Sequence, residues 1–273
     1  MLMRASRYYE LNTLRMNSRT VVAVTLSLLT LIGLSLVQPV SGQPGQWRSI
    51  NPVFPNLRDV WMVSANSGWA VGDSGTSIYW DGTQWRQVLT PYTGSATVNL
   101  NSVSCLSTNR CLAAGTNTAG PSAVLIQWDG TSWVDRSSLV PATTTGLAAV
   151  YTRSDGLTFA VGSGTPNIIR IPDANVVPIT VAPEAAVTAP GGIAPDTLRS
   201  VFVLPPGTPG SIQGFAVGDN AAVPTATTWR WDGAGWNFHS PGAGVGVLRG
   251  VQMLDANTCL LYTSPSPRDR TRS

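Results

Sequence analysis

Trp80-Asp81-Gly82-Thr83-Gln84-Trp85 is one of three near-identical copies of a six-residue stretch in this chain. The other two copies are Trp128-Asp129-Gly130-Thr131-Ser132-Trp133 and Trp231-Asp232-Gly233-Ala234-Gly235-Trp236. Aspartate and glycine tolerate positive φ, so we expect the chain to reverse at each Asp-Gly pair. A four-residue loop then sets the two flanking tryptophans opposite one another across a hairpin. Each copy therefore predicts the end of one strand and the start of the next.

The hairpins belong to a longer unit that recurs at intervals of 43 to 51 residues. Each unit opens on a Leu-x-x-Val stretch, which we interpret as the start of an inner strand. The five copies lie at residues 57–60, 100–103, 147–150, 198–201 and 248–251. A second apolar strand follows, as in Trp69-Ala70-Val71-Gly72, with copies at 112–115, 159–162 and 215–218. Four short strands per unit of this length predict an all-β fold, a β-propeller of four-stranded blades.

One unit is degenerate and one is incomplete. The third unit has Ile171-Pro172-Asp173-Ala174-Asn175-Val176 in place of the Trp pair, with the turn residues retained. Residues 46–52 resemble the outer strand at 84–89, so we expect an orphan fourth strand there. Residues 251–258 follow residues 60–67 position by position, and the match then stops. We expect at least four full blades and part of a fifth in a truncated propeller over residues 43–258.

The carboxyl-terminal residues 259–273 resemble the translation of a sequencing adapter rather than the rest of a blade. They begin Cys259-Leu260-Leu261-Tyr262-Thr263 and continue with a basic Ser/Pro stretch. We therefore expect an artefactual, disordered tail beyond Thr258. A natural basic tail is the alternative.

Composition agrees with a β-rich protein. The chain of 273 residues has 27 Gly, 20 Pro and 10 Trp but no lysine, which suits short strands and turns better than long surface helices. Its net charge of +3 comes from the two ends, because residues 43–258 hold ten arginines against eleven aspartates and Glu184. A body without a basic run is not expected to bind nucleic acid.

An amino-terminal leader precedes the repeats. Residues 21–37 form an uncharged apolar run behind several arginines, and small residues follow at Val40 and Gly42. This pattern predicts a secretory signal peptide over residues 1–42 and a secreted, periplasmic or cell-surface body. An uncleaved membrane anchor is the alternative, since 17 residues lie at the short limit of a span. Met16 is an alternative start.

Cys105 and Cys111 align with the end of the first strand and the start of the second strand in the preceding unit. In an exported protein this arrangement predicts a disulfide across the hairpin. Closing so short a loop is expected to stabilise the fold by about 2 kcal/mol.

The repeat body holds few groups for catalysis or metal binding. Glu184 and His239 are its one glutamate and one histidine, and we interpret them as a loop residue and an exposed edge residue. We expect no catalytic residues, no cofactor and no metal site. One aspartate per hairpin is too few ligands for calcium, so Asp81, Asp129 and Asp232 are interpreted as turn residues.

Binding is expected from loops more than from the repeated tryptophans. Tryptophan rings can stack on sugars or aromatic groups, but the repeated positions indicate packing between blades. The non-repeating segments 88–99, 175–195 and 204–213 are therefore the better candidates for specificity.

Two known families resemble these repeats. The stretch from Gly68 to Ile78, followed by Trp80-Asp81-Gly82-x-x-Trp85, resembles blades of the photosystem II assembly and stability factor type. It is also loosely similar to the Asp-box (BNR) repeats of sialidase-like propellers, although one residue fewer separates Asp from Trp here. Both resemblances imply a propeller over residues 56–258.

The function that follows is an exported, non-enzymatic binding or assembly scaffold with a protein or carbohydrate ligand. The alternatives are a sialidase-like glycoside hydrolase and a repeat domain of a larger cell-surface adhesion protein. Arginines that converge with a carboxylate on one ring face would favour the hydrolase. A ring face lined by Asn, Ser, Thr and aromatic residues would favour the scaffold. Contact with a membrane is expected only if the leader stays uncleaved.

Overall fold

The computed structural model describes residues 54–120, 122–184, 187, 196–207, 212–220, 226–242 and 245–263. The predicted signal peptide, the strand predicted at 46–52 and the tail beyond residue 263 lie outside the described residues. The chain divides into two units at residue 50, and the fold below is that of the second unit.

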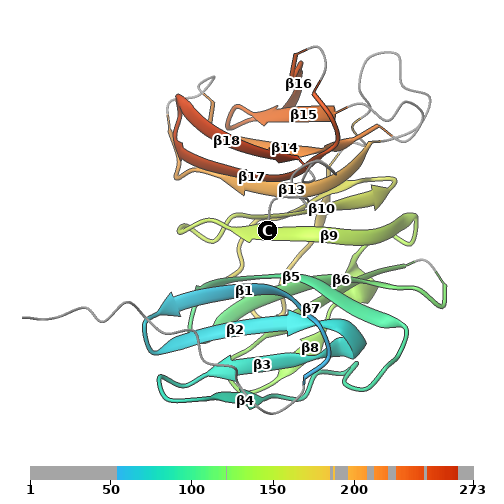
Figure 1. The fold of residues 1–273 in the computed structure, drawn as a ribbon, viewed down its shortest axis with the longest axis vertical. Helices are drawn as coiled ribbons and strands as arrows, with labels where there is room; N and C mark the ends of the chain where they lie inside the picture. The colour runs from blue at the N-terminus through green and yellow to red at the C-terminus, as the bar shows by residue number, and fades with distance from the viewer. Residues whose placement is uncertain are drawn as a thin grey trace, which may run out of the picture. The chain divides into compact units, whose positions relative to one another are not determined.

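The described chain forms five antiparallel sheets that follow one another along the sequence, from blue to red in Figure 1. The first contains β1 (Leu57–Ser64), β2 (Ser67–Gly72), β3 (Ser77–Trp80) and β4 (Trp85–Gln87). The second contains β5 (Val98–Ser107), β6 (Arg110–Asn117), β7 (Ser122–Trp128) and β8 (Trp133–Asp135). The third contains β9 (Thr144–Thr152), β10 (Thr158–Gly164), β11 (Ile168–Ile171) and β12 (Ala182–Pro183). The fourth contains β13 (Thr197–Val203), β14 (Gly214–Asp219), β15 (Ala226–Trp231) and β16 (Trp236–His239), and the fifth contains β17 (Leu248–Asp255) and β18 (Thr258–Thr263).

These sheets confirm the predicted fold class. Each of the five repeat units forms one sheet, and four of them are four-stranded with the strands in chain order. The inner strands β1, β5, β9, β13 and β17 contact one another in succession. The fold is therefore a β-propeller whose blades are the repeats. Two three-residue 3-10 turns, η1 (Asp73–Gly75) and η2 (Ser137–Leu139), complete the regular elements of the described residues.

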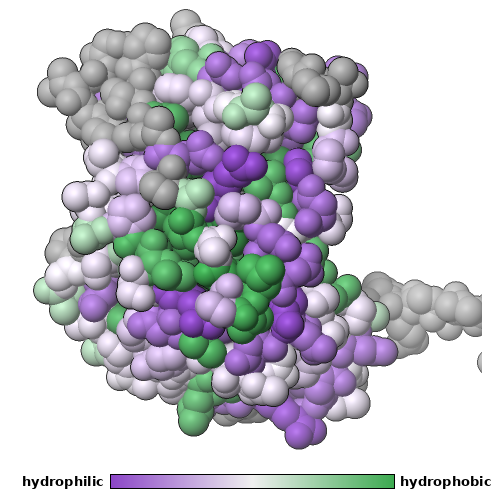
Figure 2. Space-filling model, turned by 180° about the vertical axis from the view of Figure 1, so that it is seen from behind, coloured by the Kyte–Doolittle hydropathy of each residue, from purple (hydrophilic) through white to green (hydrophobic). Residues whose placement is uncertain are grey.

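The core is divided into four clusters of buried apolar side chains. One cluster joins the first and second sheets, one the second and third, one the third and fourth, and one the fourth and fifth. Each sheet thus buries its faces against its neighbours, as radial packing requires. On the side of the molecule in Figure 2, apolar residues gather near the middle and polar residues surround them.

The Asp-Gly hairpins have the expected geometry. Trp80 pairs with Trp85 across β3 and β4, and Asp81 accepts backbone N–H bonds from Thr83 and Gln84, each 2.9 Å long. Gly82 between them has φ of 93°, a conformation that favours glycine. The same pairing joins Trp128 to Trp133 and Trp231 to Trp236.

The aspartates of these turns act as local acceptors. Asp129 accepts the N–H of Ser132 at 2.9 Å, and both the N–H and the hydroxyl of Thr131. These bonds favour the carboxylate and lower the pKa of Asp129 to about 2. Bonds from Thr83 and Gln84 lower the pKa of Asp81, and bonds from the backbone of Gly235 and Ala234 lower that of Asp232.

Two of the three Trp pairs, in the second and fourth sheets, enclose an aromatic residue of the preceding blade. The Trp69 ring on β2 lies 4.7 Å from the Trp128 ring and 5.0 Å from the Trp133 ring of the second sheet. In the same way, Phe159 on β10 lies 4.9 Å from Trp231 and 5.2 Å from Trp236 of the fourth sheet. Tilted and edge contacts of this kind add to the hydrophobic gain from burial. The Trp pairs therefore connect one blade to the next.

The third sheet departs from the prediction at its outer edge. We expected residues 171–176 to turn directly into a fourth strand. The connection instead runs to residue 181, and the fourth strand is the two-residue β12. The Glu184 N–H extends this pairing by donating to the Ile168 carbonyl at 3.2 Å. The backbone of residues 182–184 thus satisfies hydrogen-bonding groups on the outer edge of β11, which would otherwise be unpaired.

The prediction of a disordered tail directly after Thr258 is wrong for residues 259–263. These residues form most of β18, which pairs with β17 from Leu248 opposite Thr263 to Asp255 opposite Thr258. The edge of β17 offers unpaired backbone groups, and they are satisfied by the chain that follows the turn.

Cys105 and Cys111 lie directly opposite one another on β5 and β6, and a disulfide joins them. Both residues are buried in the cluster between the first and second sheets. The one free cysteine among the described residues, Cys259, lies on β18.

We expect Trp133→Ala to lower the free energy of unfolding by about 3–5 kcal/mol, because it leaves a cavity beside Trp69 in a buried interface. Trp85→Ala is the matched control, since Trp85 holds the same hairpin position in the first sheet but is only half-buried there. It should cost about 1 kcal/mol. Urea denaturation of both variants, followed by tryptophan fluorescence and circular dichroism, measures the difference. Equal losses of unfolding free energy in the two variants would contradict a stabilising contact of Trp133 with Trp69 between the blades.

Candidate functional site

A central cavity of about 500 Å³ lies where the inner strands of all five sheets meet. Every blade contributes to its lining through β1, β5, β9, β13 or β17. Backbone and side chains of the Leu-x-x-Val stretches therefore surround one space. Its volume lies within the usual range of ligand pockets in proteins.

Three aromatic residues from different blades meet beside this cavity. The Tyr151 ring on β9 lies 5.8 Å from the Trp61 ring on β1, edge to face, and 4.5 Å from the Phe202 ring on β13. Burial raises the pKa of the Tyr151 hydroxyl, so this group stays neutral at physiological pH. The three rings form a mostly apolar platform, which we call the aromatic platform.

Asp59 places a carboxylate on the same inner surface. Its two oxygens accept the backbone N–H groups of Val60 and Val103, each at 2.9 Å. Burial raises the pKa of Asp59, and these hydrogen bonds oppose the shift without cancelling it. The bond to Val103 crosses from the first blade to the second, so Asp59 also joins two blades.

This link recurs because Asp59 holds the third position of the Leu-x-x-Val stretch. Ser102 at the same position accepts the Val150 N–H of the third blade at 3.2 Å. Ser200 accepts the Val251 N–H of the fifth blade at 3.3 Å. Ala149 has no acceptor side chain, so the third blade lacks this bond to the fourth. The repeated acceptor fixes the spacing of the inner strands around the cavity.

The second position of each Leu-x-x-Val stretch is a β-bulge. In the first blade, Leu57 pairs with Gly72 and Asp59 with Val71, which leaves Arg58 between them without a partner in the ladder. The same shift skips Asn101, Ala148, Arg199 and Arg249. A bulge turns a side chain out of the regular alternation. Sequence repetition thus places these five residues at equivalent points of the inner strands.

Two of the three arginines at these bulges are held in ion pairs within their own blades. Arg58 pairs with Asp73, and Arg199 pairs with Asp219. Arg58 also donates to the Asn101 side chain at 3.2 Å, and Asn101 donates to the Leu147 carbonyl at 2.8 Å. These bonds run from the first blade to the third. A carboxylate of the same blade therefore neutralises Arg58 and Arg199.

The other candidate groups lie away from the cavity. Glu184 is 4.0 Å from Arg170, beside the outermost strand of the third sheet. His239 is an exposed residue at the end of the outer strand β16 and lies 5.6 Å from the Phe215 ring. Among the described residues, no three His, Cys, Asp or Glu side chains are grouped as a metal site would require. The helical segments of that same part of the chain are the two 3-10 turns, so none has the length of a membrane span.

Sequence reasoning missed the aromatic platform and Asp59. A signal for the platform was present, because Trp61, Tyr151 and Phe202 each lie four residues after the leucine of their repeat. Ser104 and Gln252 hold this position in the two other blades. Aligning the repeats beyond the Leu-x-x-Val stretch would have brought these residues together.

Comparisons with known proteins support the fold. No protein-family model and no curated protein matches the chain. A solved structure described as "YCF48 bound to D1 peptide" is 19% identical, with a TM-score of 0.51 over 74% of this chain and 60% of that chain. YCF48 from Cyanidioschyzon merolae is 15% identical, with a TM-score of 0.51 over 75% of this chain and 62% of that chain. The WD40 β-propeller domain of Doa1 is 16% identical, with a TM-score of 0.50 over 76% of this chain and 62% of that chain.

At these identities the similarity concerns the β-propeller fold. It agrees with the resemblance of the repeats to the photosystem II assembly factor family, and the Asp-box likeness stays a prediction. The chain covers less than two thirds of the length of each of these three proteins.

We expect Asp59→Asn to become more stable relative to the wild type as the pH rises from about 3.5 to about 7. The raised pKa of Asp59 means that the folded state holds this proton more tightly than the unfolded state, so ionisation above that pKa costs stability. Asparagine keeps an acceptor oxygen and never ionises. Denaturation midpoints of both proteins across this pH range measure the difference.

Asp129→Asn is the control with the opposite sign. The lowered pKa of Asp129 contributes stability above its unfolded pKa, and this contribution is lost as the pH falls toward about 2. The stability of the wild type relative to Asp129→Asn should therefore increase as the pH rises. The same pH trend in both variants would contradict the assignment of a burial-raised pKa to Asp59.

Proposed function

We propose that this protein is a non-enzymatic binding or assembly scaffold that holds a segment of another protein at its central cavity. The observation that carries the proposal is the aromatic platform of Trp61, Tyr151 and Phe202, contributed by three blades to one cavity. Aromatic side chains with few rotatable bonds dominate the energetics of protein recognition. YCF48, whose fold is similar, is described in complex with the D1 peptide.

The surroundings of the platform suit a polypeptide. Gln252 is exposed at the cavity and can donate to and accept from a peptide backbone. Asp59 already accepts two backbone N–H groups, so its carboxylate is occupied by structural bonds. An apolar platform with neutral amide groups beside it favours a mixed apolar and polar segment over a highly charged ligand.

The arrangement of acids and tyrosines argues against the sialidase-like alternative. Tyr151 lies on β9 and Glu184 lies beside β12, which are the two opposite edges of the third sheet. Three strand spacings of about 4.8 Å separate these edges by roughly 14 Å, too far for joint action on one bond. The other two tyrosines considered for such a site have hydrogen-bond partners within the fold. The Tyr79 hydroxyl bonds to the Ser67 hydroxyl at 3.2 Å, and the Tyr92 hydroxyl donates to Asp135 at 2.7 Å.

A library of random linear 12-residue peptides displayed on phage and selected against the immobilised protein tests this proposal. We expect enrichment of peptides with aromatic or aliphatic side chains. A synthetic copy of a selected peptide should lose affinity by about tenfold or more in Trp61→Ala, as measured by calorimetry. Gln252→Ala should weaken binding with no change in thermal stability, because this side chain is exposed.

Arg86→Ala is the control for these variants, because Arg86 is an exposed residue on the outer strand β4. It should bind the peptide as the wild type does. The proposal would be overturned if no peptide were enriched, or if the selected peptide bound Trp61→Ala and Gln252→Ala as tightly as the wild type. Turnover of a fluorogenic sialoside by the purified protein would favour the hydrolase instead.

Export to an oxidising compartment is part of the same proposal. The buried disulfide between Cys105 and Cys111 supports it, since such bonds persist outside reducing cytosol. Residues 1–42 fused to alkaline phosphatase that lacks its own leader should give an active, exported enzyme in a bacterial host. Inactive phosphatase retained in the cytosol would contradict the predicted signal peptide.

A further inference from the structure

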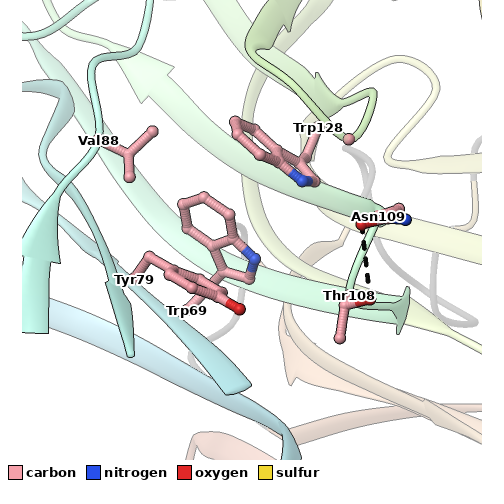
Figure 3. Close-up of a pocket in the computed structure, with 7 residues that line it drawn as sticks. Trp69, Tyr79, Val88, Thr108, Asn109 and Trp128 are labelled. Atoms are coloured by element: carbon pink, nitrogen blue, oxygen red, sulfur yellow. Dashed lines mark hydrogen bonds between the residues drawn. The ribbon is translucent and has the colours of Figure 1, made fainter. Parts of the chain in front are cut away.

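A second cleft, distinct from the central cavity, lies between the first and second blades. It has a volume of about 370 Å³ and is lined by Trp69, Tyr79, Val88, Thr108, Asn109, Trp128 and Gly130. Figure 3 shows its aromatic side chains on one side and the turn residues Thr108 and Asn109 on the other. It is therefore an aromatic cleft with a polar edge, which we call the interblade cleft.

The interface between the third and fourth blades provides an internal comparison. Tyr79 pairs with Trp69 across β2 and β3, and Arg170 pairs with Phe159 at the equivalent register of β10 and β11. The Arg170 guanidinium lies 6.0 Å from the centre of the Trp231 ring, the counterpart of Trp128. In that interface, a side chain of the protein itself covers the tryptophan.

Tyr79 does not cover Trp128 in this way. The Tyr79 ring packs on Trp69, with 4.9 Å between ring centres, and its hydroxyl bonds to Ser67. Trp231 is 1% exposed, whereas Trp128 is only half-buried. The first interface therefore presents a tryptophan surface that its counterpart keeps covered, and the space beside it is open.

Polar groups surround the open space. The Trp69 indole nitrogen is buried and has no hydrogen-bond partner among the described residues. Figure 3 shows it on the edge of the ring that faces Asn109 and Thr108. Three other tryptophans, at positions 133, 231 and 236, also have unpartnered nitrogens, but they do not line this cleft. Asn109 and Thr108 are exposed and can both donate and accept.

All the side chains that line the cleft are neutral, so none of them is an ion-pair partner for a charged ligand. The Arg110 guanidinium lies beside the cleft, where it donates to the Asp129 carbonyl at 2.7 Å, next to Gly130. The ligand that fits has an apolar face for Trp128 and several neutral hydrogen-bonding groups at its edge. A pyranose ring of a neutral sugar has both features.

We infer that the interblade cleft binds a neutral sugar unit of a glycan, stacked on Trp128 with its hydroxyls toward Asn109, Thr108 and the Tyr79 hydroxyl. This site is independent of the peptide site proposed above, because it lies between blades one and two and shares no lining residue with the central cavity. Either proposal can fail without the other.

The test measures binding of three neutral oligosaccharides, cellohexaose, mannohexaose and chitohexaose, to the full chain by calorimetry and tryptophan fluorescence. We expect saturable binding of at least one of them. Trp128→Ala should weaken it by roughly tenfold, through loss of the stacking surface. Asn109→Ala should also weaken it, and this substitution in an exposed turn leaves the core intact.

Tyr79→Arg is the sharpest variant. It copies the arrangement of Arg170 over Trp231, so the new guanidinium should cover Trp128 and abolish sugar binding while the protein stays folded. Trp85→Ala, a hairpin tryptophan away from the cleft, should bind sugar like the wild type. Failure of all three sugars to bind, or binding that ignores Trp128 and Tyr79, would overturn the inference. Binding of a proline-rich peptide at Trp128 without any sugar binding would overturn the ligand class.

Discussion

Contact between successive blades is the constraint on which this fold depends. A four-stranded sheet of short strands cannot bury its own faces, so each blade is stable only against a neighbour. The Trp pairs supply much of that contact, because Trp128 and Trp133 enclose Trp69 of the preceding blade, as Trp231 and Trp236 enclose Phe159. Where the pair is missing, in the third blade, the facing residue is Leu112, and it packs in an aliphatic cluster with Ile169 and Ile171. Where one blade lacks the Trp pair, the facing residue of the preceding blade is also aliphatic, so the two surfaces of each interface match in kind.

The same repetition forms the central cavity. A β-bulge after each leading leucine shifts the ladder by one residue, and close backbone approach at this point requires glycine on the second strand. A Cβ at Gly72 would meet the Asn56 carbonyl at 2.1 Å, and one at Gly218 would meet the Thr197 carbonyl at 2.0 Å. The next residue of the stretch then bonds to the following blade, as Asp59 bonds to Val103. Spacing of the inner strands is therefore determined by the bulge and by these side-chain acceptors together, and the platform position is Trp, Ser, Tyr, Phe or Gln in the five blades.

Local patterns in the sequence predicted most of the fold. The Asp-Gly hairpins, the paired tryptophans and the recurring Leu-x-x-Val stretches each have a period that few architectures explain, and the sheets follow them. The errors arose where pairing depends on what edge is available, as at β12 and at residues 259–263 of β18. Composition did not predict either strand, because the unpaired N–H and C=O groups of a strand edge can bond to the backbone of almost any sequence. The aromatic platform was missed for a related reason: its members are separated by 90 and 51 residues in sequence, and only the packing of successive blades brings them together.

Differences between equivalent positions carry the functional information in such a chain. Identical residues at a repeat position serve packing that every blade needs, so they say little about a ligand. At the position of Tyr79 and Arg170, the two interfaces share their architecture and differ in one side chain. The longer cationic side chain reaches over Trp231, whereas the tyrosine ring turns to Trp69 and leaves Trp128 half-buried. An exposed tryptophan surface is costly in water, so a position that leaves one uncovered beside an open space marks where a partner contributes the missing contact.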